Sequence, residues 1–421
     1  MAYAKPFEAR ELPDLPEAPG WRDVLQQAFL ANGELEAAYF RWRAAVERID
    51  PATSWPNSNV TLGYSYMFSG ERMKAFDRMT FSAGFDSMEN LTLPVKATQA
   101  GRVALNEARS AGERFRAAKF ELQRRVLTSW TQYGLVSERT EVRRRDTELL
   151  RYLEQTAGAR VRSGKPTSEV SRATVALREA ENELKNLDAE RSAIQAMLNG
   201  LLSRAADAPL PAPPGVDVRE LRVDDASLLA AAVEQNPELA SLARDVEGRT
   251  DALELARLAW VPDINPSIAF TGGVSQAIGA AIVLPSNVVR IRGRIEESRA
   301  ALSESQAMLR QTTRERASSY VATLIALRNA ERQGRLYDEE VIPAAESAVA
   351  SLRAQYAASM AGLTEYIDAQ RALLEARLAR AEARAAREER LAELEALAGV
   401  DAETLENKRD TTQGNPNEQG R

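Results

Sequence analysis

The sequence predicts a mainly α-helical protein with a small β part, organised as two tandem repeats that each combine long coiled-coil helices with one β-hairpin. Three observations support this fold class. Short segments recur in the same order about 200 residues apart, apolar residues recur at steps of three and four over long stretches, and two shorter segments alternate apolar with polar residues.

The internal repeat is the most informative feature. The segment 25–35 is matched by 229–239, an offset of 204 residues, and Leu198-Asn199-Gly200 is matched by Leu397-Ala398-Gly399, an offset of 199. Several weak matches in one order indicate a duplicated unit. We therefore divide the chain into five parts, which are an N-terminal extended segment 1–20, a first repeat 21–208, a Pro-rich linker 209–224, a second repeat 225–400 and a disordered tail 401–421.

Each repeat is expected to contain a helix, a hairpin, a long helix, a turn and a further helix. The two shorter helices of a repeat together match its long helix in length, so they can stack end to end along it. Pro343 should kink the second long helix. The predicted helices are 22–48, 97–158 and 168–201 in the first repeat and 225–259, 287–356 and 364–397 in the second.

Composition narrows the possible functions. The chain has 421 residues, 44% of them hydrophobic and 28% charged, so it can form a packed fold. It has no Cys and no His, which excludes thiol, disulfide and imidazole chemistry and the usual zinc ligands. Acidic and basic residues are interspersed, which argues against a nucleic-acid surface. We expect no catalytic, cofactor-binding or metal site.

The start of the chain and its apolar runs bear on location. No run approaches the roughly 18 apolar residues of a transmembrane helix. Residues 1–6 lack the apolar region of a signal peptide. The chain is therefore either cytosolic or a mature form whose targeting segment has been removed.

The hairpins, at 57–93 and 264–285, show the alternation of amphipathic strands. Four such strands can form a small soluble sheet, or they can contribute to a membrane barrel. Open sheet edges are not viable in lipid, so a membrane barrel requires several copies of the chain. In that case the lipid-facing residues are Val60, Leu62, Tyr64, Tyr66, Phe68, Phe81, Phe85, Ile268 and Phe270.

The order of elements and the stretches 342–346 and 363–376 resemble the TolC-type outer-membrane efflux factors, over roughly residues 20–400. The resemblance implies a homotrimer with a 12-stranded β-barrel in the bacterial outer membrane and an α-barrel in the periplasm. It also implies a periplasmic adaptor and an inner-membrane pump as partners, and a passive exit duct for small molecules or metal ions. The alternative is a soluble coiled-coil scaffold protein without a transport role.

The resemblance also assigns roles to the two turns that join the coiled-coil helices. Such turns dock the adaptor, although Gly and Pro there also serve simply to reverse the chain, with Thr167, Ser168 and Thr364 capping the following helices. The residues expected to dock the adaptor are Ser163, Gly164, Lys165, Thr167, Ser168, Ser359, Gly362, Leu363 and Thr364.

Acidic residues stand just inside these turns. Glu365 and Asp368 lie three apart on one predicted helix face, and Glu169 holds the corresponding place in the first repeat. By resemblance they form the acidic constriction of the channel, where rings of carboxylates favour cations. The competing interpretation is that these acids complement the helix dipole. A hydrolase based on paired carboxylates would need further site chemistry that the sequence does not offer.

Overall fold

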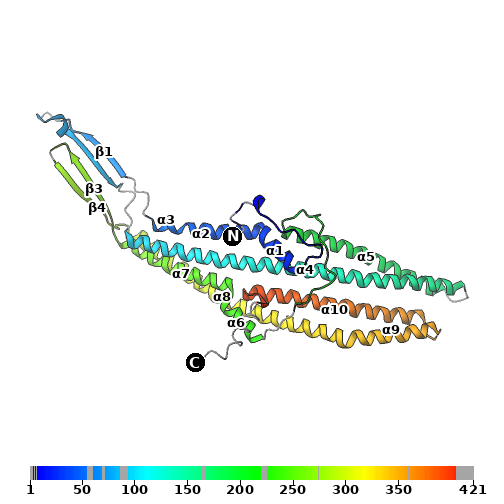
Figure 1. Cartoon of the computed structure of the whole chain (residues 1–421). Helices are drawn as coiled ribbons and strands as arrows, with labels where there is room; N and C mark the ends of the chain where they lie inside the picture. Colours follow the sequence, from blue (N-terminus) through cyan, green and yellow to red (C-terminus); the bar gives the residue numbers. More distant parts are fainter. Residues whose placement is uncertain are drawn as a thin grey trace, which may run out of the picture. The chain divides into compact units, whose positions relative to one another are not determined.

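The structure is a computed structural model, and it describes residues 3, 5, 7–54, 60–68, 72–85, 93–162, 167–219, 225–273, 275–358 and 360–403. Long helices and one small sheet make up these residues (Figure 1). The chain divides into two compact units. Unit 1 contains residues 1–37, 116–236 and 316–421, and unit 2 contains residues 38–115 and 237–315, so each unit draws on both sequence repeats.

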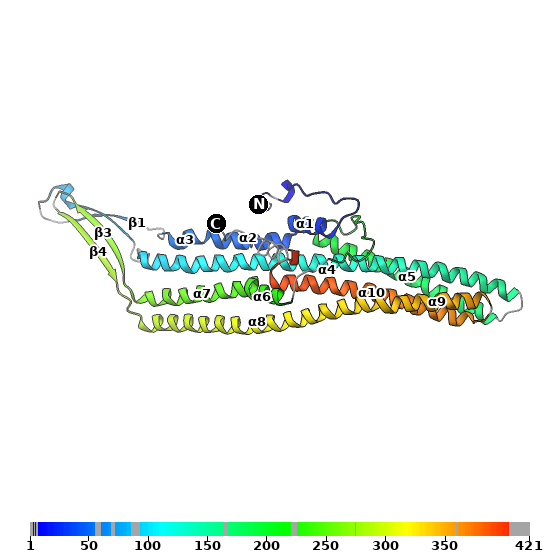
Figure 2. The same ribbon diagram turned by 60° about the horizontal axis from the view of Figure 1, so that its bottom comes forward.

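Unit 1 is a helical assembly. It contains α1 (Trp21–Ala31), α5 (Thr167–Leu201), α6 (Asp225–Gln235), α9 (Ile342–Ala357) and α10 (Leu363–Ala398), and also parts of α2 (Gly33–Glu47), α4 (Pro94–Arg162) and α8 (Val288–Leu336). The helices α9 and α10 lie side by side (Figure 2). The core of this pair includes Leu153 and Ala173, from α4 and α5, packed with Ile342, Tyr356 and Ile367. Four helices therefore share one core.

Unit 2 contains α3 (Ile49–Thr53), α7 (Pro237–Arg257), the 3₁₀ turn η4 (Leu258–Trp260), all four strands and the remaining parts of α2, α4 and α8. Trp42 of α2 stacks on Phe115 of α4, with ring centroids 5.8 Å apart. Gly112 permits this approach, since a Cβ there would lie 3.1 Å from Trp42 Nε1. A polar seam joins α4 to α7, where Gln99 and Asn106 both donate to Asp251.

The four strands form one antiparallel sheet in the order β1-β2-β3-β4. The strands β1 (Val60–Tyr66) and β2 (Met79–Phe85) form the first hairpin, whose connection includes η3 (Ala75–Arg78), and β3 (Asp263–Thr271) and β4 (Ser275–Val283) form the second. At the turn of the second hairpin, Gly272 adopts a left-handed conformation with φ +47°, which favours glycine. The first hairpin holds this turn, because Asp77 Oδ1 accepts a bond from Gly273 N.

The predicted element order is confirmed, but three predicted helices are interrupted. The predicted helix 22–48 breaks at Asn32, and the predicted helix 225–259 breaks before Pro237. The predicted helix 287–356 does not simply kink at Pro343. It forms a π turn, η5 (Tyr337–Val341), in which Ile342 N bonds to the oxygen of Tyr337, five residues back. Pro343 has no N–H and its ring crowds the carbonyl four residues before it, and the wider turn accommodates both effects.

The two breaks are equivalent joints. Asn32 accepts bonds from the N–H groups of Glu34 and Leu35 and donates to the oxygen of Leu201, at the end of α5. Asn236, 204 residues later, donates in the same way to the oxygen of Leu397, near the end of α10. The sequence repeat is thus preserved in side-chain contacts.

The inter-repeat linker is held against the helices as far as it is described. Tyr133 donates to the oxygen of Leu210, and Gly134 lets the chain pass so closely that a Cβ there would lie 2.5 Å from Gly215 O. In the N-terminal segment, η2 (Phe7–Ala9) precedes Arg10, which forms an ion pair with Glu36. Among the described residues, none of the helices has both the length and the apolar character to cross a bilayer.

Candidate functional site

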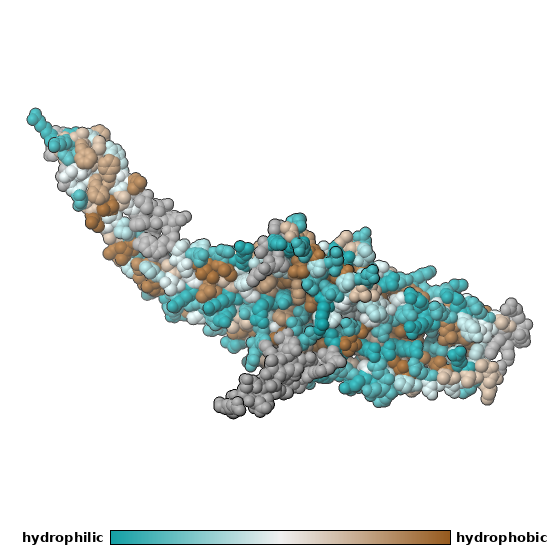
Figure 3. Space-filling view, viewed as in Figure 1, coloured by the Kyte–Doolittle hydropathy of each residue, from teal (hydrophilic) through white to brown (hydrophobic). Residues whose placement is uncertain are grey.

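The sheet of unit 2 has one apolar face. The register places Tyr64 opposite Phe81 and Phe81 opposite Phe270, and a second row aligns Leu62, Ala83, Ile268 and Ile278. Residues directly opposite each other in antiparallel strands share a face, so both rows lie on the same side. Figure 3 shows apolar residues gathered along this sheet. The face is exposed rather than covered by other parts of the chain, since Leu62 is 79% and Ile278 is 88% accessible.

The predicted lipid-facing residues fall on this face with one exception. Leu62, Tyr64, Tyr66, Phe81, Ile268 and Phe270 occupy positions of equal parity, as do Val60 and Phe85, whose side chains lie outside the described part of the structure. Phe68 lies two residues beyond the end of β1, so it belongs to the connection and not to the strand. Ile278 and Ile282 share this face but were not predicted, although the same alternation in β4 could have identified them.

The opposite face carries only small side chains. One row aligns Ser65, Thr80, Thr271 and Ser275, and Thr80 and Thr271 share a hydroxyl hydrogen bond of 3.1 Å. Another row contains Gly84, Ser267 and Gly279. A Cβ added to Gly84 would lie 3.0 Å from the Cβ of Ser267, whereas opposed Cβ atoms are ordinarily about 4.5–5.5 Å apart. Gly84 therefore permits a close approach of β2 and β3 on this small-residue face.

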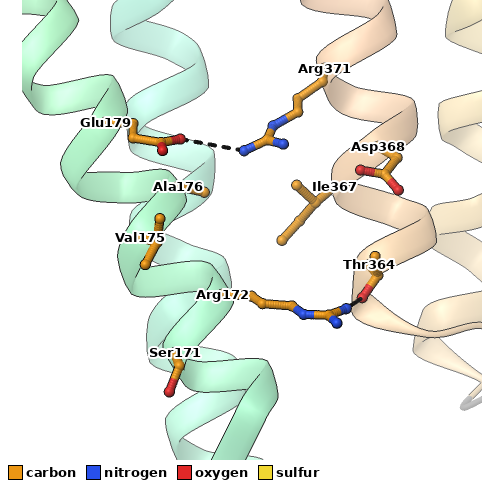
Figure 4. A pocket seen from close by; sticks show the side chains of 9 residues that line it. All are labelled: Ser171, Arg172, Val175, Ala176, Glu179, Thr364, Ile367, Asp368 and Arg371. Carbon is orange, nitrogen blue, oxygen red and sulfur yellow. Dashed lines mark hydrogen bonds and ion pairs between the residues drawn. The ribbon is translucent and has the colours of Figure 1, made fainter.

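The second candidate site is a groove between α5 and α10 in unit 1, with a volume of about 410 Å³ (Figure 4). Two contacts join the helices across it. Arg172 donates to Thr364 Oγ1 at 2.5 Å, and Arg371 lies 3.6 Å from Glu179. Ile367 lies between these contacts (Figure 4). The contacts tie the first repeat to the second at the start of α10.

The structure describes the side chains of two of the three residues that were predicted to form the acidic constriction. Glu365 and Asp368 are exposed in the first turns of α10 and have no hydrogen-bond or ion-pair partner within the described part of the chain. Asp368 lines the groove beside Arg371 (Figure 4). Glu169 lies in α5, but its side chain is outside the described part. The structure brings Asp368 near the α5–α10 contacts and leaves both carboxylates available.

Burial changes the acid–base behaviour of one neighbouring group. Asp146 of α4 is partly buried, and this burial raises the pKa of its carboxyl, while the guanidinium groups of Arg143 and Arg371 act in the opposite direction. Arg371 therefore faces two acidic groups, Asp146 and Glu179. Within the residues that the structure describes, three or more acidic, His or Cys side chains do not gather into a possible metal site.

The predicted docking residues have different environments. Thr167 and Ser168 begin α5 and are exposed, and Gly362 is the N-cap residue of α10 with no atom within 4 Å of an added Cβ. Leu363 was expected at the surface, but it is only 2% exposed and belongs to the core around Tyr356 and Tyr366. The predictions for Ser163, Gly164, Lys165 and Ser359 lie outside the described residues.

Thr364 does not have the capping role considered from the sequence. It is the second residue of α10, the N-cap position belongs to Gly362, and the helix start has no side-chain cap. The Thr364 hydroxyl instead accepts the bond from Arg172. Thr364, which was expected to cap the helix or to dock the adaptor, therefore takes part in the contact between the two repeats.

A buried ion cluster in unit 1 was not predicted. Arg219, at the end of the described linker, lies 2.9 Å from Glu388 and 3.0 Å from Glu395, both on α10 and both nearly inaccessible. Arg387 joins the same carboxylates through Glu388. The sequence signal was weak, because Glu388 and Glu395 lie seven residues apart in a helix rich in charged residues and Arg219 is distant along the chain.

The fold of the chain is similar to that of solved bacterial membrane proteins. The chain matches a membrane protein from Pseudomonas aeruginosa with 18% identity and a TM-score of 0.77, covering 93% of this chain and 97% of that one. It matches the outer-membrane protein VceC from Vibrio cholerae with 16% identity and a TM-score of 0.74, covering 90% and 96%.

A third solved structure, the CmeC outer-membrane channel from Campylobacter jejuni, matches with 13% identity and a TM-score of 0.72, covering 93% of this chain and 89% of that one. No protein-family model and no curated protein matches the sequence. The fold expected from the resemblance to TolC-type factors, mainly α with a small antiparallel sheet, is confirmed.

Proposed function

We propose that the chain forms one third of a trimeric outer-membrane exit duct, which passes small molecules or metal ions as the last component of a tripartite efflux system. The observation that carries this proposal is the two-faced sheet. An exposed face with Leu62, Phe270 and Ile278 is costly in water but suited to lipid, while an opposite face rich in Ser, Thr and Gly is suited to a water-filled lumen.

Assembly of several copies follows from the edges of this sheet if it lies in a bilayer. Its outer strands, β1 and β4, have no partner on their outer sides within the described chain. Unpaired strand edges are not tolerated in a bilayer, so β4 of one copy must pair with β1 of the next. Three copies would supply twelve strands. The fold likeness to an outer-membrane channel such as CmeC supports this arrangement.

The rival function is that of a soluble coiled-coil scaffold protein. It accounts for the long helices but not for the exposed aromatic and aliphatic rows of the sheet, which would cause aggregation in water. A duct should require detergent and migrate as a heat-resistant trimer, whereas a scaffold should remain in solution without detergent. Extraction followed by size measurement separates these two functions.

Within the duct, we assign the periplasmic constriction to Glu365 and Asp368, with Glu169 as their counterpart in the first repeat. Both described carboxylates are exposed and unpaired within the described chain, so three copies around an axis would form rings of negative charge. Replacement of both by alanine should raise single-channel conductance in planar bilayers and lower the preference for cations.

The matched control replaces Glu375 and Glu382, which are exposed acids one and two heptads beyond Asp368 on the same helix. These changes should alter conductance and selectivity less. Equal effects of the two pairs would place the constriction elsewhere, and an inactive wild-type protein would count against the duct itself.

The adaptor is proposed to dock at the exposed starts of α5 and α10, through Thr167, Ser168 and Gly362. A tryptophan at Gly362 has open space around it, so it should not disturb the helix. Co-purification of the adaptor should fall while the trimer persists. Undiminished co-purification with Gly362→Trp would remove this docking assignment.

A further inference from the structure

The apolar face of the sheet continues into the first turn of α8. Leu284 follows β4 with the same parity as Ile278 and Ile282, and it is 69% exposed. Val289, the second residue of α8, is 83% exposed. The described strands contain a single charged residue, Asp263, and Lys96 neutralises it at 2.8 Å. A nearly charge-free strip thus ends at α8.

Three arginines stand where this strip ends. Arg290, Arg292 and Arg294 are exposed, and their guanidinium groups have no hydrogen-bond or ion-pair partner in the described part of the chain. This differs from the usual pattern on these helices, where an arginine pairs with an acid three residues away, as Arg299 does with Glu296 at 2.6 Å. Arg290 and Arg294, one helical turn apart, therefore form an unneutralised pair of cations on one side of α8, while Arg292 lies on another side.

The position of Arg290, in the first turn, is also unfavourable for the helix itself. The first turn of α8 contains no acidic residue, and cations at the start of a helix are repelled by its dipole. An anion bound beside them would relieve this repulsion. Guanidinium groups bind phosphate oxygens in a bidentate manner, and the adjoining Leu284 and Val289 offer contacts for hydrocarbon chains.

We propose that Arg290 and Arg294, together with Leu284 and Val289, form a binding surface for the headgroups of anionic phospholipids. This inference rests on the proposed function, because it requires the sheet to lie in a bilayer. The surface lies at the end of the apolar strip nearest the helices, where the headgroups of one leaflet would meet α8. The aliphatic residues favour a phospholipid over free phosphate as the ligand.

The test uses the full chain purified in detergent and exposed to mixed micelles of phosphatidylglycerol and phosphatidylcholine. The ratio of the two lipids that co-purify is measured by mass spectrometry. Wild-type protein should be enriched in phosphatidylglycerol. The double variant Arg290→Gln/Arg294→Gln should lose about 10- to 30-fold of this enrichment, since each basic residue near an anionic surface contributes roughly a factor of five.

The control is Arg310→Gln/Arg314→Gln, a pair with the same spacing on the same helix, which is also exposed and without a partner in the described chain. It should retain the enrichment. Equal loss in both variants would indicate general charge attraction and would overturn the proposal, as would unchanged enrichment in Arg290→Gln/Arg294→Gln. Displacement of phosphatidylglycerol by inorganic phosphate, but not by chloride at equal ionic strength, would identify free phosphate as the ligand and overturn it too.

Conductance of the same preparations separates this inference from the function on which it rests. Both variants should keep the trimer and the wild-type conductance, because the arginines lie outside the proposed constriction. A wild-type protein without channel activity would count against the duct, whereas normal conductance with no lipid preference would count against the lipid-binding surface alone.

Discussion

Arg219 shows how much a single side chain can contribute in this fold. Its guanidinium lies between Glu388 and Glu395, and both carboxylates are almost fully buried. Burial raises the pKa of the Glu395 carboxyl, while the charge of Arg219 acts in the opposite direction. The backbone N–H of Ala402 also donates to Glu395. One arginine of the linker thereby fixes the linker to α10.

We expect Arg219→Met to lower the free energy of unfolding by about 3–5 kcal/mol, because it keeps the volume but leaves the buried Glu395 without its cation and Glu388 with Arg387 alone. The midpoint of thermal unfolding measures this loss. Arg244→Met, which breaks an exposed pair with Glu247, should cost less than about 1 kcal/mol. Restoration of stability by adding Glu388→Gln and Glu395→Gln would confirm the electrostatic cause, and its absence would refute it.

The same variant should show a pH dependence with a definite sign. A carboxyl whose pKa is raised in the folded state favours folding below the ordinary glutamate pKa, and this contribution is lost as the pH rises through the raised value. Removing Arg219 raises that pKa further. The deficit of Arg219→Met should therefore be smaller at about pH 5 than at about pH 8. A deficit that grows toward acid pH would contradict this account.

Single residues were predicted best where their role is local. The parity of Leu62, Tyr64 and Phe270 follows from alternation alone, so their common face could be predicted. Leu363 was placed wrongly, because its burial depends on Tyr356 and Tyr366 meeting across the turn. Arg219 was missed because its partners lie 169 and 176 residues further along the chain.

At the scale of elements, the joints at Asn32 and Asn236 explain how a short helix can continue another. Asn32 uses its carbonyl oxygen to cap α2 and its amide to bind the end of α5. Helix ends leave N–H and C=O groups without partners, and an asparagine can serve both kinds at once. Aspartate can cap but cannot donate.

Substitutions at Asn32 should separate the two roles. Asn32→Ala should cost about 1–2 kcal/mol, since the cap and the donor to Leu201 are both lost. Asn32→Asp should cost less, because the cap remains. Thermal unfolding of both variants provides the measurement. An aspartate variant no more stable than the alanine variant would show that the bond to Leu201 O, and not the cap, dominates at this joint.

Element boundaries were predictable where coiled-coil periodicity runs without interruption. The ends of α4, α5 and α10 lie within four residues of those expected. The breaks were missed because the apolar period continues across them, although Asn32-Gly33 and Asn236-Pro237 are both recognisable helix-start signals. The π turn was expected only as a kink, since sequence patterns do not indicate how a helix accommodates a proline.

At the scale of the whole molecule, the two faces of the sheet govern the proposed assembly. Neighbouring residues of β4 point to opposite faces of the sheet. Substitutions at Ala277 and Ile278 therefore probe the two faces separately, although the positions are adjacent in sequence. The fold class could be predicted from the repeat and the alternation. Closure of a ring could not be derived from one chain, since it depends on contacts between copies.

Ile278→Lys should prevent assembly of a heat-resistant trimer in membranes, because a lysine on the lipid face costs about 2–4 kcal/mol near the middle of a bilayer in each copy. Ala277→Lys should assemble and shift channel selectivity toward anions, because the lysine would line the lumen. Migration on electrophoresis with and without heating, followed by bilayer recordings, gives both readouts. If Ala277→Lys prevented assembly and Ile278→Lys changed selectivity instead, the assignment of the lipid face and the lumen face would have to be exchanged.

The pairing of β2 with β3 sets an order of events for folding. Thr80 and Thr271 meet although 191 residues separate them, whereas each hairpin joins strands that are close in sequence. An isolated hairpin is at best marginally stable, and closing so long a loop carries a large entropic cost. We therefore expect the four strands to unite after α4 and α7, which are joined through Asp251, have brought the hairpins together. If the chain acts as the proposed duct, it would reach the membrane with its most apolar surface still unassembled.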